Sequence, residues 1–123
     1  STTDAIMNLS VISKKPIEIH NNGLQKRDFI FVNDVCNALI TELNKEFKTT
    51  EVKINTNRFI NILTLKSCLD EISKKNNNSK HIKAPDGYDD RIYKKPILKN
   101  KKNLIKKLKL TYNWYKGVEK WKF

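Results

Sequence analysis

The sequence predicts a single small α/β domain. Short runs of alternating or continuous apolar residues, typical of strands, alternate along the chain with apolar residues at helical spacing. The 123 residues, of which 38% are hydrophobic, suffice for one modest core. We find no internal repeat and no apolar run long enough to cross a membrane. We therefore expect residues 1–123 to form one unit with a few short strands and four or five helices.

The first half of the chain reads as helix, strand, turn, strand and helix. Residues 2–13 have helical spacing, and residues 16–20 alternate like a strand that ends in a turn at Gly23. Residues 29–32 are an apolar run typical of a buried strand, and Asn33 can cap a helix over residues 34–47. The predicted core face of the first helix is Ile6, Leu9 and either Ile12 or Ser13. That of the second helix is Val35, Leu39, Leu43 and Phe47.

The second half continues the alternation. Residues 51–55 alternate like a strand, and Thr64 can cap the next helix. A short strand over 81–84 and two terminal helices, over 100–108 and 113–120, complete the prediction. The predicted apolar face of the helix after Thr64 is Leu65, Cys68, Leu69 and Ile72.

The two cysteines, Cys36 and Cys68, both lie in apolar helical patterns. Neither belongs to a CxxC pair or a Cys/His cluster, so we expect buried free thiols rather than a metal site. Free thiols fit the reducing cytoplasm, and the start of the chain shows no signal-peptide pattern. A chain that begins at Ser1 indicates a processed or engineered product or a fragment.

The chain is strongly basic. Its 25 Lys and Arg against 13 Asp and Glu give a net charge of +12, which attracts polyanions, nucleotides and membrane surfaces without specifying one. An AT-rich coding sequence would produce the same abundance of Lys, Asn and Ile. Residues 94–109 contain no acidic residue and resemble a nucleic-acid patch, but a solvated helix face is the alternative, because the aromatic and arginine side chains that read bases are missing.

The most informative segment is Gly23–Ile40. It contains a glycine turn, a cationic pair, a short apolar run and a capped helix, in that order. This order predicts that Arg27 lies at the mouth of a cleft and can hold an anion. We find no other convincing catalytic group, and we expect Tyr112 and Trp114 to seat the C-terminal helix.

The pattern Arg27-Asp28-Phe29-Ile30-x-Val32-x-Asp34-Val35 resembles the RDF-(I/V)-x-V-x-D-V signature of NAD-dependent epimerases/dehydratases. These are extended short-chain dehydrogenases that act on nucleotide sugars. Five further segments resemble that family in the same order, over nearly the whole chain. They are Lys15–Ile19, Val52–Asn55, Thr64–Ile72, Tyr88–Arg91 and Leu104–Leu108. The resemblance is to the C-terminal, substrate-binding portion, without the Rossmann portion.

The resemblance implies roles for several side chains. Arg27 would bind the diphosphate of the nucleotide sugar, since a guanidinium offers a planar fork to phosphate oxygens; a structural salt bridge to Asp28 or Asp34 is the alternative. Asp28 would hold the turn by accepting backbone N–H groups. Phe29 would line the nucleoside pocket or belong to the core.

Three later residues complete the candidate site. Asn55 would lie near the nucleotide or close a loop, and Arg91 would be a second phosphate ligand. Tyr88 would stack on the base or sugar, or be a surface aromatic. The family's G-x-G after the asparagine is replaced by Asn57-Arg58-Phe59, which puts the nucleoside contacts in doubt, although Arg58 can add a phosphate contact.

The resemblance implies a part of an NAD(P)-dependent nucleotide-sugar epimerase or dehydratase that is inactive on its own. Its three glycines, at 23, 87 and 117, cannot form a dinucleotide loop, so we expect no cofactor bound by this chain alone. The implied partners are a nucleotide-diphosphate sugar, the missing Rossmann portion and a second copy of the full-length enzyme. The alternatives are a basic RNA-binding or polyanion-binding module and a structural piece that packs on a separate Rossmann chain; the sequence names neither base nor sugar.

Overall fold

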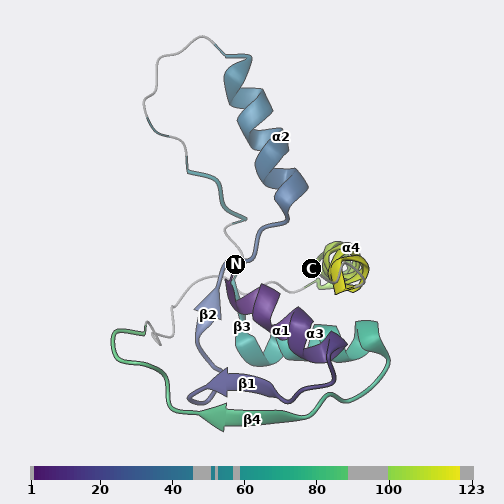
Figure 1. Ribbon diagram of the computed structural model, residues 1–123. Helices are drawn as coiled ribbons and strands as arrows, with labels where there is room; N and C mark the ends of the chain where they lie inside the picture. The colour runs from purple at the N-terminus through teal and green to yellow at the C-terminus, as the bar shows by residue number, and fades with distance from the viewer. Residues whose placement is uncertain (1, 46–50, 52, 57–58, 89–99, 120–123) are drawn as a thin grey trace.

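The computed structural model describes residues 2–45, 51, 53–56, 59–88 and 100–119. Within this part of the chain it confirms a small α/β fold of helices and short strands (Figure 1). The elements, in chain order, are α1 (Thr2–Ile12), β1 (Ile17–His20), β2 (Lys26–Arg27), α2 (Val32–Leu43), β3 (Ile60–Asn61), α3 (Ile62–Ser73), β4 (Ser79–Ile82) and α4 (Lys102–Glu119).

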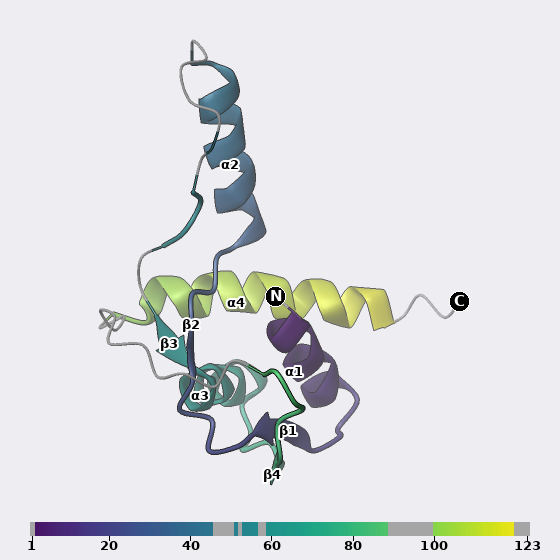
Figure 2. The ribbon, with the colours of Figure 1, turned by 90° about the vertical axis from the view of Figure 1, so that its left-hand side faces the viewer.

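The body of the molecule is built in layers. β1 and β4 pair in parallel, from Ile17 opposite Ser79 to His20 opposite Ile82. The helices α1 and α3 lie side by side on this pair, and α4 crosses them on the far side (Figures 1 and 2). β2 and β3 form a second, antiparallel pair at the base of α2.

The core lies between these layers and draws on α1, β1, β3, α3 and α4. Ile17, Leu65 and Leu69 are completely buried, and full burial of each such side chain contributes about 1.5–3 kcal/mol. The buried apolar residues are Met7, Val11, Ile17, Ile19, Ile60, Ile62, Leu65, Cys68, Leu69 and Leu108.

The predicted core face of α1 is wrong. Ile6 and Leu9 are 52% and 44% exposed, whereas Met7 and Val11, four residues apart on the neighbouring face, are buried. Asn8, completely buried beside this face, donates its Nδ2 to the Asp4 backbone carbonyl at 2.9 Å within the helix. The apolar period therefore predicted the helix but not its orientation.

The predicted core stripe of α2 is also wrong. None of the residues of α2 is buried, and Leu39 and Leu43 are 49% and 69% exposed. The helix projects away from the layered body (Figures 1 and 2), so the described residues give its apolar side chains no layer to pack on. Cys36, expected to be buried, is exposed on it, while Cys68 is buried as predicted; Phe47 lies outside the described residues.

Two predicted strands and two caps differ from the structure. Residues 29–31 belong to no strand and Val32 begins α2, while the described residues of 51–55 form no strand either. α2 begins one residue before Asn33 and has no side-chain cap. Asn61, rather than Thr64, caps α3: its side-chain oxygen accepts from the Thr64 backbone N–H at 2.8 Å.

The C-terminal part forms one helix, not the two predicted. α4 runs without a break through Leu110–Tyr112, where the sequence suggested an interruption. Neither proline nor glycine occurs there, and the Thr111 hydroxyl donates to the Lys107 carbonyl at 3.2 Å within the helix. Tyr112 packs on the core as expected, but Trp114 is 60% exposed.

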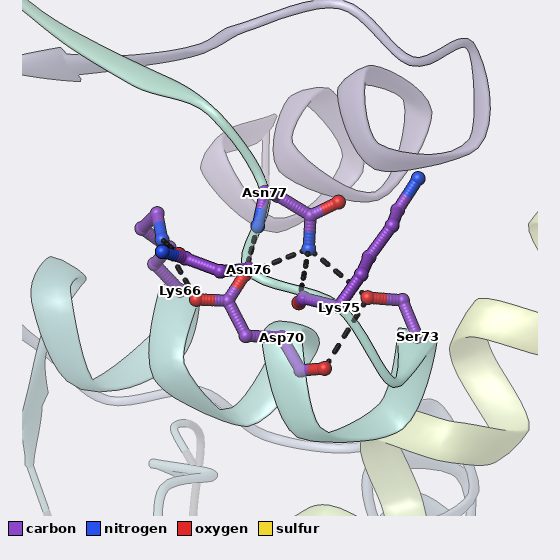
Figure 3. A network of polar contacts seen from close by, with 6 residues as sticks. All are labelled: Lys66, Asp70, Ser73, Lys75, Asn76 and Asn77. Atoms are coloured by element: carbon purple, nitrogen blue, oxygen red, sulfur yellow. Dashed lines mark hydrogen bonds and ion pairs between the residues drawn. The ribbon is translucent and has the colours of Figure 1, made fainter.

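A polar network joins the end of α3 to the start of β4 (Figure 3). Asp70 accepts from Lys66 Nζ at 2.7 Å and from both the backbone N–H and the side-chain amide of Asn77, at 3.0 and 2.7 Å. Burial alone would raise the pKa of Asp70, but these donors outweigh it and hold the pKa below its ordinary 3.8. The network thereby fixes the turn that brings β4 beside β1.

None of the helices in the described part of the chain is both long enough and apolar enough to cross a membrane.

Candidate functional site

The site begins at the turn between β1 and β2. Gly23 has a φ of +74°, which side-chain-bearing residues rarely adopt. A Cβ there would lie 2.8 Å from side-chain carbons of Ile19 and Leu63. The Gly23 carbonyl also accepts from the Leu63 N–H at 3.2 Å. The turn is therefore pressed against the first turn of α3, and the chain leaves it as the strand that carries Arg27.

Arg27 lies on β2, opposite Ile60 of β3. Its Nη1 donates to the Lys26 carbonyl at 2.9 Å, and its guanidinium carbon lies over the Tyr88 ring, 5.4 Å from the ring centre. This separation is within the range of a cation–π contact. Two of the predicted site residues, 61 positions apart in the chain, are thus brought together.

Asp28 ties a second predicted segment to this one. Its carboxylate accepts from the Thr56 backbone N–H at 3.0 Å and from the Thr56 hydroxyl. The expectation that Asp28 accepts backbone N–H groups is confirmed, although the donor comes from a distant segment rather than from its own turn. Because Asn55 precedes Thr56, this contact also brings Asn55 close to the strand of Arg27.

A cavity of about 340 Å³ lies beside residues 28–31, which follow β2; Arg27 itself does not line it. Residues 28–31, the base of α2 and one side of α4 line it. Phe29 is half-buried; it lines this cavity and also packs against the core. Burial raises the pKa of Asp4, which also lines this cavity, because the charged form is desolvated.

An ion pair connects the base of α2 to α4 at the same cavity. Lys107 Nζ lies 2.5 Å from Asp34 Oδ2, with the two side chains 32% and 40% exposed. Asp34, one alternative partner for Arg27, is therefore engaged by Lys107. Pairs this exposed contribute little stability, about 0–1 kcal/mol.

Asn55 is exposed and lines a second, more open cavity of about 450 Å³ between α2 and residues 53–56. Phe29 and Asn55 therefore line different cavities, which share Ile30, Asp34 and Thr56 in their walls. Arg91 and Arg58 lie outside the described residues.

Two participants were missed by the sequence analysis, Gln25 and Thr56. Gln25 is only 1% exposed, and its amide joins His20 and Tyr88. A glutamine beside a glycine turn gives no periodic signal of burial. Thr56 follows Asn55 in a polar loop, and nothing in its neighbourhood in the sequence marks it as the partner of Asp28.

The described residues do not fit a dinucleotide cofactor. A dinucleotide-binding loop needs closely spaced glycines whose backbone is open to a phosphate. Gly23 is closed by the side chains of Ile19 and Leu63, and Gly87 and Gly117 lie far from it in the sequence. Within the described residues, no three His, Cys, Asp or Glu side chains are grouped to hold a metal ion.

The fold is that of part of a nucleotide-sugar epimerase or dehydratase. The chain is similar to UDP-N-acetylglucosamine 4-epimerase from Methanobrevibacter ruminantium, in complex with UDP-N-acetylmuramic acid, with a TM-score of 0.79 and 16% identity over 94% of this chain and 39% of that one. It is similar to UDP-glucose 4-epimerase from Thermotoga maritima, with UDP-glucose, at a TM-score of 0.75 and 22% identity over 94% of this chain and 39% of that one. It is also similar to dTDP-glucose 4,6-dehydratase from Bacillus anthracis, in complex with NAD, at a TM-score of 0.75 and 21% identity over 97% of this chain and 40% of that one.

The sequence carries the matching family pattern. Residues 3–56 match the NAD dependent epimerase/dehydratase family, which confirms the resemblance over this segment. The chain spans about two fifths of the length of the solved structures it matches. No curated protein matches it.

Proposed function

We propose that this chain supplies the nucleotide-diphosphate binding of an NAD(P)-dependent nucleotide-sugar epimerase or dehydratase, as the C-terminal part of such an enzyme. The observation that carries the proposal is Arg27, placed on β2 with its guanidinium over Tyr88. A guanidinium fixed in this way meets a diphosphate without first losing the freedom of a long side chain. Asn55 and Arg91 would add contacts to the nucleotide, and Phe29 would line the nucleoside pocket.

The chemical step belongs to residues outside this chain. The hydride-transfer chemistry of the complete enzyme would be supplied by NAD(P) bound outside this chain. The contribution of this part is to orient the sugar, and orientation accounts for much of the rate in such reactions. We expect the isolated chain to bind nucleotides weakly and to catalyse nothing. As part of a nucleotide-sugar enzyme with free cysteines, it would work in the cytoplasm.

The proposal is tested by titrating the ¹⁵N-labelled chain with UDP, TDP, GDP and CDP and following amide shifts. We expect saturable binding that prefers one base and is weakened at least about tenfold in Arg27→Ala, since charge-assisted contacts to phosphate contribute about 1.5–3 kcal/mol. The matched control is Lys26→Ala, which removes a neighbouring cation from the same strand. If both substitutions weakened nucleotide binding equally and only slightly, Arg27 would contribute no more than its charge. That result would contradict the proposal.

The exposed side chains of α2 support the missing Rossmann portion as a partner. Val32, Ile40 and Leu43 are 63%, 55% and 69% exposed on a helix that projects from the body. We propose that this face packs against that portion in the complete enzyme, which would also form homodimers. Sequencing the coding region upstream of Ser1 tests this assignment. A strand, a glycine-rich loop and a Tyr-x3-Lys pair are expected there, and an unrelated domain or a stop codon would contradict it.

The rival function, binding of RNA or another polyanion, is favoured by one observation. Within the described residues, α4 exposes Lys102, Lys106 and Lys109, and the stretch around them contains no acidic residue. The same titration with a single-stranded RNA, at low salt and at about 0.15 M salt, separates the two functions. Tight RNA binding with a steep salt dependence, unchanged by Arg27→Ala, would favour the rival.

A further inference from the structure

We infer that Tyr88 is a positioning residue: its ring holds the Arg27 guanidinium in place for a diphosphate, and buried Gln25 holds the ring. The inference rests on the proposed function and extends it to residues that do not themselves touch the ligand. It replaces the expectation that Tyr88 stacks on the base or sugar of the substrate.

The ring of Tyr88 is held from two directions. Its hydroxyl accepts from Gln25 Nε2 at 3.1 Å, and the His20 ring meets it edge-on, with ring centres 4.8 Å apart and planes at 77°. Gln25 is fixed in turn, because the same Nε2 donates to the His20 carbonyl at 3.1 Å and the side chain is 1% exposed. A ring held in this way offers Arg27 a platform whose position does not depend on a ligand.

The backbone also directs Tyr88 to this place. After β4, the Ala84 N–H donates to the Asn21 side chain at 3.2 Å, which anchors the start of the following loop to the end of β1. The Tyr88 N–H then donates to the Pro85 carbonyl at 3.1 Å, and Gly87 adopts a φ of +80°. The chain therefore turns back toward β2 and brings the ring to within 5.4 Å of the Arg27 guanidinium carbon.

A positioning residue and a stacking residue differ in which ligands they affect. If Tyr88 acts through Arg27, its loss weakens UDP and inorganic pyrophosphate in the same proportion, because both need the guanidinium. If it stacks on the base, its loss weakens UDP alone. Because the cation–π contact is lost, we expect Tyr88→Leu to weaken both ligands about three- to tenfold.

The experiment titrates the whole chain and its variants with UDP and with pyrophosphate by NMR. Tyr88→Phe keeps the ring, so we expect it to stay within about twofold of the unmodified chain. Tyr88→Leu in the Arg27→Ala background should have no further effect. The Arg27 Nε–Hε signal, shifted by the ring current of Tyr88, should move in Tyr88→Leu and stay in Tyr88→Phe.

Lys116→Ala is the matched control, since Lys116 Nζ lies 5.6 Å from the centre of the Tyr112 ring on α4, in a similar contact away from the site. Amide-shift dispersion shows whether each variant is folded. Normal affinity for both ligands in folded Tyr88→Leu, or a loss confined to UDP, overturns the inference while the role of Arg27 stands. A normal affinity of Arg27→Ala overturns the proposed function instead.

Discussion

The helices α2 and α3 have much in common and yet behave differently in the structure. Each has 12 residues, one cysteine and several branched apolar side chains. α3 buries Ile62, Leu65, Cys68 and Leu69, whereas α2 buries none of its residues. α3 is enclosed by α1, α4 and the strands, while α2 projects from the body (Figure 2).

The difference extends to the helix ends. α3 starts at a side-chain cap from Asn61 and ends at Lys74 in the left-handed conformation, whereas α2 starts at Phe31 without a side-chain cap. A cap contributes about 1 kcal/mol to a helix, and tertiary packing contributes most of the rest. The comparison teaches that α3 is held by this chain, and that α2 presents an apolar face for which the described residues provide no partner layer.

The largest effect is expected from matched truncations in the two helices. Leu69→Ala should lower the free energy of unfolding by about 2–5 kcal/mol, because the side chain is completely buried and leaves a cavity. Leu39→Ala, at a side chain 49% exposed, should change it by less than about 0.5 kcal/mol. Urea unfolding followed by circular dichroism measures both, and equal losses would show that α2 is part of the core.

The cysteines report on the same two regions. Cys36 is exposed on α2, whereas Cys68 is buried on α3 and burial raises the pKa of its thiol. Since the thiolate is the reactive form, Cys36 should react with an aromatic disulfide reagent at least about 100-fold faster than Cys68. Cys36→Ser should abolish the fast phase and leave the slow one. Two equally fast phases in the native chain would mean that α3 opens as readily as α2.

An intermediate effect is expected at the glycine turn that connects the site to α3. Gly23→Ala should cost about 1–3 kcal/mol of stability, since it combines a positive φ with overlap against Ile19 and Leu63. Gly87→Ala is the control, because its φ of +80° is similar but a Cβ there meets no atom within 4 Å. Thermal unfolding compares the two, and the excess loss at Gly23 measures the overlap; no excess would contradict it.

The smallest effect is expected from the network that ends α3. The folded pKa of Asp70 is lowered, so the stability that this carboxylate contributes is present above its ordinary pKa of 3.8 and is lost as the pH falls through the lowered value. Asp70→Asn should therefore cost about 1 kcal/mol at pH 7 and nearly nothing in strong acid. Unfolding curves between pH 2 and 7 are the measurement; a parallel offset at every pH would contradict the assignment to charge.

Parts of the fold could be predicted from the sequence because they depend on the spacing of residues within one segment. The apolar face of α3 was predicted correctly, since all its predicted members lie on a helix enclosed by other elements. The face of α1 was not, because Met7 and Val11 compete with Ile6 and Leu9 and only the packed layers decide between them. The exposure of α2 could not be predicted, because helical spacing shows that a face exists and not what covers it.

The candidate site shows the same division. Arg27 and the role of Asp28 as an acceptor could be inferred from the motif, which lies in one continuous segment. The contacts of Arg27 with Tyr88 and of Asp28 with Thr56 join segments far apart in the chain. Such contacts form only because the fold brings the chain after β4 and the segment before β3 next to β2. No local sequence pattern predicts this arrangement.

The parallel pairing of β1 with β4 has a consequence for how the molecule folds. Ile17 pairs with Ser79, so a long stretch of chain, including the whole of α3, must close before the first rung of this pair forms. Pairing between such distant segments is slow because the loop entropy is lost before the contacts are gained. We therefore expect α3 to form early and the β1–β4 pair late, which makes joining of the two strands the step that limits the folding rate.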